Sequence, residues 1–204
     1  MGKINKVHGG ATVIEEERKT IEENVAEKEV KNVEEKNKIV KYAAGLIRDD
    51  DFIYLDAGTT TGKLIDCIKR TKAVFVTNGI FHAKRLTQKG IKVFLLGGEL
   101  KLSTEAMIGM TALDALKQYN FTKAFLGANG IHEQYGFTTP DPAEAMIKKE
   151  GMNRSFMRCV LADSSKFGQI SSVSFGNLSQ ACIVTDQLKN KKYADYTVIR
   201  EVGL

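Results

Sequence analysis

The chain of 204 residues lacks the features that define several other classes of protein. No apolar run approaches the roughly 20 residues that a membrane-spanning helix needs, and the opening residues MGKINK lack the apolar core of a signal peptide. The three cysteines form no CxxC, and the three histidines show no metal-ligand spacing. We therefore expect a cytoplasmic protein with buried thiols, no membrane partner, no bound metal and no cofactor.

Two signatures of nucleotide binding are absent as well. The stretch AGTTTGK (57–63) lacks the GxxxxGK[ST] spacing of a Walker A loop, and it is not a GxGxxG loop. A strong basic charge is also missing, because the net charge of +5 is mild for this length. Such a charge does not establish nucleic-acid binding, and small anionic ligands explain it equally well.

Composition divides the chain near residue 31. Residues 1–31 are polar and densely charged, as in EEERKTIEENVAEKEVK, which indicates a solvated linker with some helical tendency or, equally, a flexible tail. From residue 32, NVEEKNKIVKYAAGLIRDD places its apolar residues near one helical face. We expect a helix that has Asn32 as its N-cap and acidic residues in its first turn, and that ends at residues 49–51.

The remaining sequence alternates between two kinds of pattern. Short apolar runs predict strands at 52–55, 73–76, 92–96, 123–126, 157–161, 181–184 and 197–202. Helical patterns fall between them, at 61–69, 80–89, 104–119 and 142–155. Near-continuous apolar strands separated by helices indicate an α/β fold with a mostly parallel open sheet and helices on both faces.

Small and polar residues follow five of the predicted strands. These segments are LDAGTTTG (55–62), VTNG (76–79), LLGGEL (95–100), LGANGI (126–131) and LADSSKFG (161–168). In an open parallel sheet, ligands bind at the carboxyl ends of the strands. The five segments would then lie along one edge of the sheet and could form a single site.

The first of these segments has the chemistry of an anion site. Gly58 permits a sharp turn and a close approach of backbone to ligand, and Thr59, Thr60 and Thr61 open the next predicted helix. Free N–H groups at a helix N-terminus, together with hydroxyl donors, suit a phosphate. The alternative is that Thr59 or Thr60 only caps the helix.

The other segments supply further candidates, each with an ordinary structural alternative. Asp163 and Lys166 could both bind a ligand, or could form an exposed ion pair within their loop. Asn78 and Asn129 each precede a glycine, which is also common turn chemistry. Glu144 lies one helical turn before Lys148, a spacing that more often gives a surface salt bridge.

The segments considered as a set are more specific than any one of them. In order along the chain they are HGGA (8–11), DAGTTT (56–61), TNG (77–79), LLGGEL (95–100), GANGI (127–131), GFTTPDPAEA (136–145) and ADSSKFG (162–168). The set resembles the C-terminal effector-sensing domain of the DeoR family of bacterial sugar-operon repressors. TTPDPAEA is most similar to repressors of fructose or lactose phosphotransferase operons.

The resemblance implies a fold similar to ribose-5-phosphate isomerase and a phosphorylated sugar effector that alters operator affinity. The phosphate would lie on Gly58, Thr59, Thr60 and Thr61. The rest of the pocket would be lined by Asp56, Thr77, Asn78, Gly97, Gly98, Asn129, Glu144, Asp163 and Lys166, with Lys148 as a weaker candidate.

In the family, a helix-turn-helix unit precedes the HGGA motif, and family members commonly form homo-oligomers. Only seven residues precede His8 here, so we expect that the operator-reading unit is absent. Residues 1–31 would then be an interdomain linker remnant, and residues 32–204 the sugar-phosphate-sensing domain.

Two further functional hypotheses remain open. The domain could be a sugar-phosphate isomerase that uses Asp163, Glu144 and Lys166 for proton transfer and enediolate stabilisation. It could also be an oligomerisation domain with a vestigial pocket. The resemblance favours a regulatory binding domain without catalytic residues.

Overall fold

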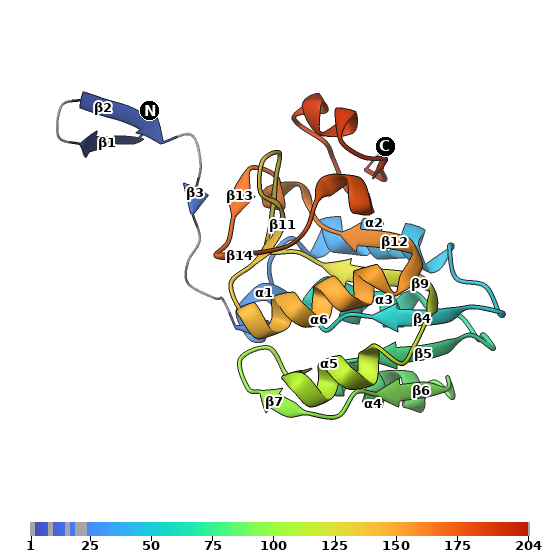
Figure 1. Ribbon diagram of the computed structural model, residues 1–204. Helices are drawn as coiled ribbons and strands as arrows, with labels where there is room; N and C mark the ends of the chain where they lie inside the picture. Colours follow the sequence, from blue (N-terminus) through green and yellow to red (C-terminus); the bar gives the residue numbers. More distant parts are fainter. Residues whose placement is uncertain (1–2, 8–9, 15–16, 19–23, 204) are drawn as a thin grey trace.

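A seven-stranded parallel sheet organises the molecule (Figure 1). The computed structural model describes residues 3–7, 10–14, 17–18 and 24–203. Each neighbouring pair in the order β16-β15-β12-β9-β4-β5-β6 is parallel. The strands are β4 (Phe52–Leu55), β5 (Val74–Thr77), β6 (Val93–Leu95), β9 (Phe121–Gly127), β12 (Ser155–Leu161), β15 (Cys182–Thr185) and β16 (Ile199–Glu201).

Helices cover both faces of this sheet. One face carries α2 (Val33–Ala44), α3 (Thr59–Cys67) and α4 (Ile80–Gln88), and the other carries α5 (Met110–Leu116) and α6 (Pro142–Asn153). Side chains of β4 alternate between the two cores: Ile53 and Leu55 pack under α2 and α3, and Tyr54 packs under α6. The predicted parallel α/β architecture is confirmed.

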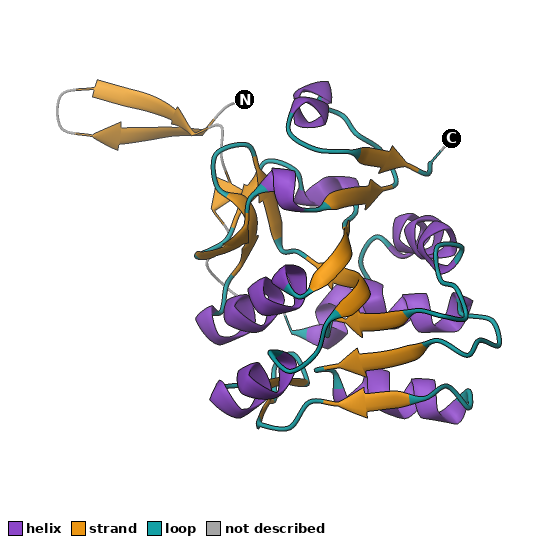
Figure 2. Cartoon of the chain, turned by 45° about the vertical axis from the view of Figure 1, so that its right-hand side comes forward, coloured by secondary structure: helices purple, strands orange, loops and turns teal. Residues whose placement is uncertain are grey.

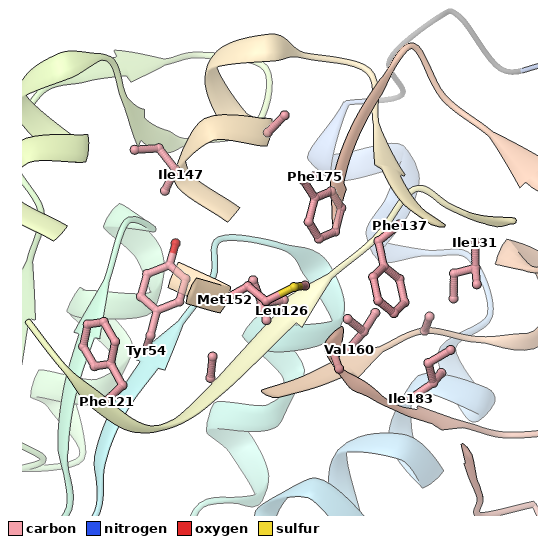
Figure 3. Close-up of a cluster of buried hydrophobic side chains, with 14 of the residues drawn as sticks. Tyr54, Phe121, Leu126, Ile131, Phe137, Ile147, Met152, Val160, Phe175 and Ile183 are labelled. Carbon is pink, nitrogen blue, oxygen red and sulfur yellow. The ribbon is translucent and has the colours of Figure 1, made fainter. Parts of the chain in front are cut away.

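Tyr54 shows how closely α6 approaches the sheet. Its ring lies 5.6 Å from that of Phe121 and is fully buried in the cluster drawn in Figure 3. A Cβ at Gly151 in α6 would overlap this ring. Glycine at position 151 therefore lets α6 lie against the sheet, which brings its first two turns to the carboxyl ends of the strands.

Smaller elements surround the main sheet. β10 (Gly130–His132), β11 (Gly136–Thr139) and β14 (Val173–Gly176) form an antiparallel sheet beside α6, and β7 (Glu99–Lys101) pairs with β8 (Ala106–Ile108). β3 (Glu17–Arg18) pairs with β13 (Gln169–Ile170). Three short 3-10 helices lie at Ser164–Lys166, Leu178–Gln180 and Lys191–Asp195.

The N-terminal region contains elements that the sequence did not predict. β1 (Lys3–Val7) and β2 (Gly10–Ile14) form a hairpin that stands apart from the body (Figures 1 and 2). The first two residues of the HGGA motif lie outside the described residues. Among the described residues of this region, α1 (Val25–Glu29) realises the helical tendency; there Asn24 accepts from Glu27 N at 2.9 Å and Glu27 accepts from Asn24 N. No described helix is long and apolar enough to cross a bilayer.

Two sequence predictions about helices were wrong. The expected helix at 104–119 begins only at Met110, because residues 99–108 form the β7–β8 hairpin and Gly109 has a φ of 89°. The helix after Asn32 ends at Ala44 rather than at 49–51. Asn32 itself is left-handed, with φ 51°, and makes no capping hydrogen bond, because its side chain is drawn to Asp163.

Candidate functional site

A cleft opens where the chain reverses its direction across the sheet. From β4 the chain proceeds outward to β5 and β6, whereas from β9 it proceeds the other way to β12, β15 and β16. Open α/β sheets bind ligands at such a switch point. The cleft holds about 770 Å³ of empty space, its open mouth included, and is lined by Val25, Lys28, Lys31, Asn32, Lys36, Ala57, Gly58, Thr59, Thr60, Thr104, Gly127, Ala128, Asn129, Glu144, Lys148, Leu161, Ala162, Asp163 and Lys166.

The N-terminus of α3 forms one wall of the cleft. Thr61 is fully buried, and its Oγ1 donates to the carbonyl oxygens of Asp56 and Gly58, at 2.6 and 2.9 Å. Asn78 fixes the preceding turn by accepting from Ala57 N at 2.8 Å. The first-turn N–H groups have no acceptor within the helix itself, and here they accompany the Thr59 and Thr60 side chains at the cleft wall. This arrangement suits an anion.

An ion pair forms the floor. Lys148 Nζ donates to Asp56 Oδ2 and lies 3.3 Å from the carbonyl oxygen of Gly127, and Gly127 N donates to the same Asp56 oxygen at 3.0 Å. Both charged side chains are buried. Burial raises the pKa of Asp56, and Lys148 opposes that effect. Asp56 thus fixes the position of the Lys148 ammonium group from below.

Asp163 joins the 3-10 helix at Ser164–Lys166 to the start of α2. Its Oδ1 accepts from Asn32 Nδ2 at 2.9 Å, from Ser165 N at 3.1 Å and from the Ser165 hydroxyl. Asp163 is 1% exposed, which contradicts the alternative of an exposed ion pair with Lys166 within the loop. Asp163 holds the entry to α2 against the β12 end of the cleft.

Glu144 joins α6 to the β7–β8 hairpin. Its Oε1 accepts from the Thr104 hydroxyl and lies 3.3 Å from Lys101 Nζ. Asp141 caps α6 by accepting from Glu144 N at 2.9 Å and pairs with Lys101 at 3.0 Å. Glu144 makes these contacts in place of the i,i+4 bridge to Lys148 that its spacing suggested.

The electrostatic character of the cleft is cationic. Five lysines line it, against two carboxylates. Lys36 is buried and donates to the carbonyl oxygen of Lys28 in α1. Burial lowers the pKa of Lys36, and Asp163 opposes that effect. Lysines held close together favour a negatively charged occupant, because an anion relieves their mutual repulsion.

The structure divides the sequence-predicted site residues into three groups. The cleft is lined by Gly58, Thr59, Thr60, Asn129, Glu144, Asp163 and Lys166. Asp56 and Asn78 lie behind it, where they support Lys148 and the Ala57 turn. Thr61, Thr77, Gly97 and Gly98 do not line it.

Physical reasons account for the last group. The Thr61 hydroxyl turns inward to cap its own turn, and Thr77 accepts from Gly79 N at 3.1 Å within the core. Gly98 has a φ of 133°, and a Cβ there would crowd the Ile108 carbonyl and Ala112. Gly98 therefore shapes the β7–β8 hairpin and its contact with α5.

Sequence reasoning missed Lys36, Lys28 of α1 and Lys31, which follows that helix, and it underrated Lys148. A signal for Lys36 was present, because it shares a helical face with the buried Ile39, Val40 and Ala43. A lysine on an apolar face must reach a buried partner.

Comparison with known proteins identifies the family. Residues 31–187 match the family model of the DeoR C terminal sensor domain. The chain belongs to the DeoR family. The predicted family is confirmed, and the cleft described above is the cleft of a sensor domain of a transcriptional regulator.

Curated relatives of this DeoR-family chain are regulators. The chain is 44% identical over 205 residues to an uncharacterized HTH-type transcriptional regulator, FruR, of Bacillus subtilis, covering 98% of this chain and 81% of the relative. It is 32% identical over 209 residues to the lactose phosphotransferase system repressor of Streptococcus mutans, with the same coverage of 98% and 81%.

Among solved structures, ribose 5-phosphate isomerase A from Methanocaldococcus jannaschii matches with a TM-score of 0.50 at 19% identity. The match covers 67% of this chain and 55% of the isomerase chain. This likeness supports the predicted isomerase-like fold.

Proposed function

We propose that the cleft binds a phosphorylated sugar and that the bound sugar changes the affinity of the regulator for its operator. The observation that carries the proposal is the meeting of the α3 N-terminus with the lysines of the cleft. Helix N–H groups and lysine ammonium groups are both established donors to phosphate in proteins. The phosphate would bind against Gly58, Thr59 and Thr60.

The sugar would extend from the phosphate toward α6 and the end of β9. Asn129 Oδ1 accepts from Thr139 Oγ1 at 3.2 Å, which orients its amide nitrogen as a donor for a ligand hydroxyl. Glu144 and Lys148 supply an acceptor and a donor on the other side. The name of one relative, a lactose phosphotransferase system repressor, is consistent with a phosphorylated sugar as the ligand.

The coupling to DNA would run through α1. Lys36 reaches the carbonyl oxygen of Lys28, and Val25 N donates to Ser103 O at 3.3 Å, so α1 spans the cleft mouth from α2 to the β7–β8 hairpin. A ligand that binds these lysines shifts the regulator only if it prefers one position of α1 over another. Residues 32–204 would form the sensing unit, and the preceding segment would connect it to an operator-reading unit, in a homo-oligomeric regulator acting in the cytoplasm.

We propose a binding role without catalysis. An isomerase needs a carboxylate that is able to take a proton from the substrate. Asp163 Oδ1 accepts three hydrogen bonds from its own chain, and Glu144 Oε1 is held by Thr104 and Lys101. These contacts occupy one oxygen of each carboxylate and disfavour the use of either group as a proton-abstracting base.

A thermal-unfolding screen tests this proposal. The ligands are hexose 1-phosphates and 6-phosphates, and the controls are the unphosphorylated hexoses and inorganic phosphate. A ligand at 100 times its dissociation constant stabilises the folded state by about 2.7 kcal/mol. We expect one sugar phosphate to raise the unfolding temperature and to be recovered unchanged afterwards. Conversion of that ligand to its isomer would favour an enzyme, and equal shifts with the unphosphorylated sugar would contradict the phosphate site.

A further inference from the structure

Two cysteines that stand far apart in the sequence are neighbours in the main sheet. Cys159 of β12 and Cys182 of β15 are direct partners in the parallel register, and their Sγ atoms lie 3.1 Å apart. The third cysteine, Cys67, ends α3 and is outside this pair. Sequence spacing did not indicate the pairing, because only the strand order brings the two thiols together.

The backbone positions suit a covalent link. Neighbouring strands lie about 4.8 Å apart, which is within the Cα separations of about 4.4–6.8 Å found across disulfides. Partners in a parallel register point to the same face of the sheet, so the two thiols already face each other. Closing the sulfur–sulfur distance from 3.1 Å to the bonded value of about 2.05 Å needs only small side-chain rotations.

The two thiols differ in their access to solvent. Cys159 is fully buried in the core with Val40 and Ala43 of α2. Cys182 is half-buried and lines a surface cavity with about 1220 Å³ of empty space, its open mouth included, beside Tyr42 and Arg158. A small oxidant that enters this cavity can contact Cys182. Cys159 lies behind Cys182, where it can act as the second thiol.

The hydrogen bonds around the pair also distinguish the two sulfurs. Cys182 Sγ lies 3.1 Å from the carbonyl oxygen of Arg158, to which its thiol donates, and Cys159 donates to Cys182. The bond from Cys159 lowers the pKa of Cys182, whereas that same contact and burial raise the pKa of Cys159. The sulfur of the half-buried Cys182 is thus the better nucleophile of the two.

We propose that Cys159 and Cys182 form an oxidisable dithiol, which a peroxide converts to a disulfide between β12 and β15. The Cys182 thiolate attacks one peroxide oxygen, the O–O bond breaks, and water leaves with the proton of the thiol. The Cys159 sulfur then attacks the resulting sulfenic acid, the S–O bond breaks, and a second water leaves. Two thiols lose two electrons and two protons, and hydrogen peroxide is reduced to two waters.

The test is intact mass and peptide mapping of the folded chain after treatment with hydrogen peroxide. The wild type and the matched control Cys67→Ser should lose about 2 Da, for the two hydrogens removed. Their non-reduced digests should contain one peptide pair, joined through Cys159 and Cys182, that a reductant separates. Cys182→Ser should form no such pair.

Three results would overturn the proposal. One is a wild type that keeps all three thiols under conditions that fully oxidise a small dithiol. Another is a gain of about 16 or 32 Da on Cys182 without a disulfide, which marks sulfenic or sulfinic acid as the end point. The third is a disulfide that includes Cys67. If Cys182→Ser fails to fold, the peptide map of the wild type still decides among these results.

Discussion

Lys148 of α6 reaches down to the carboxylate of Asp56, which directly follows β4, and the two form a buried ion pair beneath the cleft. The pair connects the helix on one face of the sheet to the turn that leads into α3. It places an ammonium group next to the helix N-terminus at which we propose phosphate binding. Lys148 is thus held in position before any ligand arrives.

The first prediction concerns the stability of this pair. Lys148→Met should lower the free energy of unfolding by about 3–5 kcal/mol, because it leaves the Asp56 charge buried without its partner. Adding Asp56→Asn should restore much of that loss, since the amide oxygen can still accept from Gly127 N. Urea unfolding of the two single variants and the double variant measures the coupling. Additive losses would show that the pair is not coupled.

The second prediction concerns pH. His82 is buried against Thr61, with 3.1 Å between its Nε2 and the Thr61 hydroxyl oxygen. Burial, followed by the nearby charge of Arg85, lowers the pKa of His82 from 6.5 to about 4. Between pH 6.5 and about pH 4 the unfolded chain binds a proton at His82 that the folded chain does not. The free energy of unfolding is therefore at its full value above pH 6.5 and decreases as the pH falls toward 4.

The lowered pKa of His82 corresponds to a loss of about 3 kcal/mol in the free energy of unfolding between neutral pH and pH 4. Chemical unfolding of the wild type and of His82→Gln, repeated from pH 7 to pH 4, should give curves that diverge by this amount. A histidine proton titration by NMR should place the pKa of His82 at about 4. Parallel stability curves for the two proteins would contradict the assignment.

The third prediction concerns the α3 wall. Thr60→Glu should weaken sugar-phosphate binding by at least about tenfold, or 1.4 kcal/mol, because it brings a carboxylate to the anion site. Thr60→Gln has nearly the same size without the charge and should weaken binding much less. Calorimetric titration of both variants separates charge from bulk. Equal losses of affinity in the two variants would mean that the size of the side chain at position 60, and not its charge, prevents binding.

The fourth prediction concerns Lys166, one of the lysines that line the cleft. Lys166→Met should weaken binding by about tenfold or more, since a hydrogen bond to a charged group contributes about 1.5–3 kcal/mol. It should also reduce the dependence of affinity on salt, since one cationic contact is removed. Lys117→Met is the matched control, because Lys117 pairs with Asp114 at 3.0 Å outside the cleft. A matching loss in the control would point to a general effect of net charge.

The local sequence pattern predicted the strands and the turn into α3, because these depend on residues that are close together in the chain. Apolar runs gave the seven strands of the main sheet, and the DAGTTT segment gave the turn into α3. The pattern did not separate the threonines: Thr59 and Thr60 line the cleft, but Thr61 turns inward. All three occupy one helical turn, and only the fold decides which of them faces the ligand.

Contacts across the chain explain the remaining errors. Asn32 has the composition of a helix cap, but its amide binds Asp163, which is 131 residues away. Thr104 has a helical context, yet it lies at the β7–β8 turn and binds Glu144. The partners of Asn32 and Thr104 are set by the order of strands and by the hairpin. No local periodicity carries that information.

The most direct test of the account is one pair of calorimetric titrations of the wild-type chain. The first uses the sugar phosphate that gives the largest thermal shift, and the second uses the same sugar without its phosphate. The account predicts that the phosphorylated sugar binds at least about 100-fold more tightly, or 2.7 kcal/mol. Equal affinities for the two sugars would contradict a phosphate site at Gly58, Thr59 and Thr60.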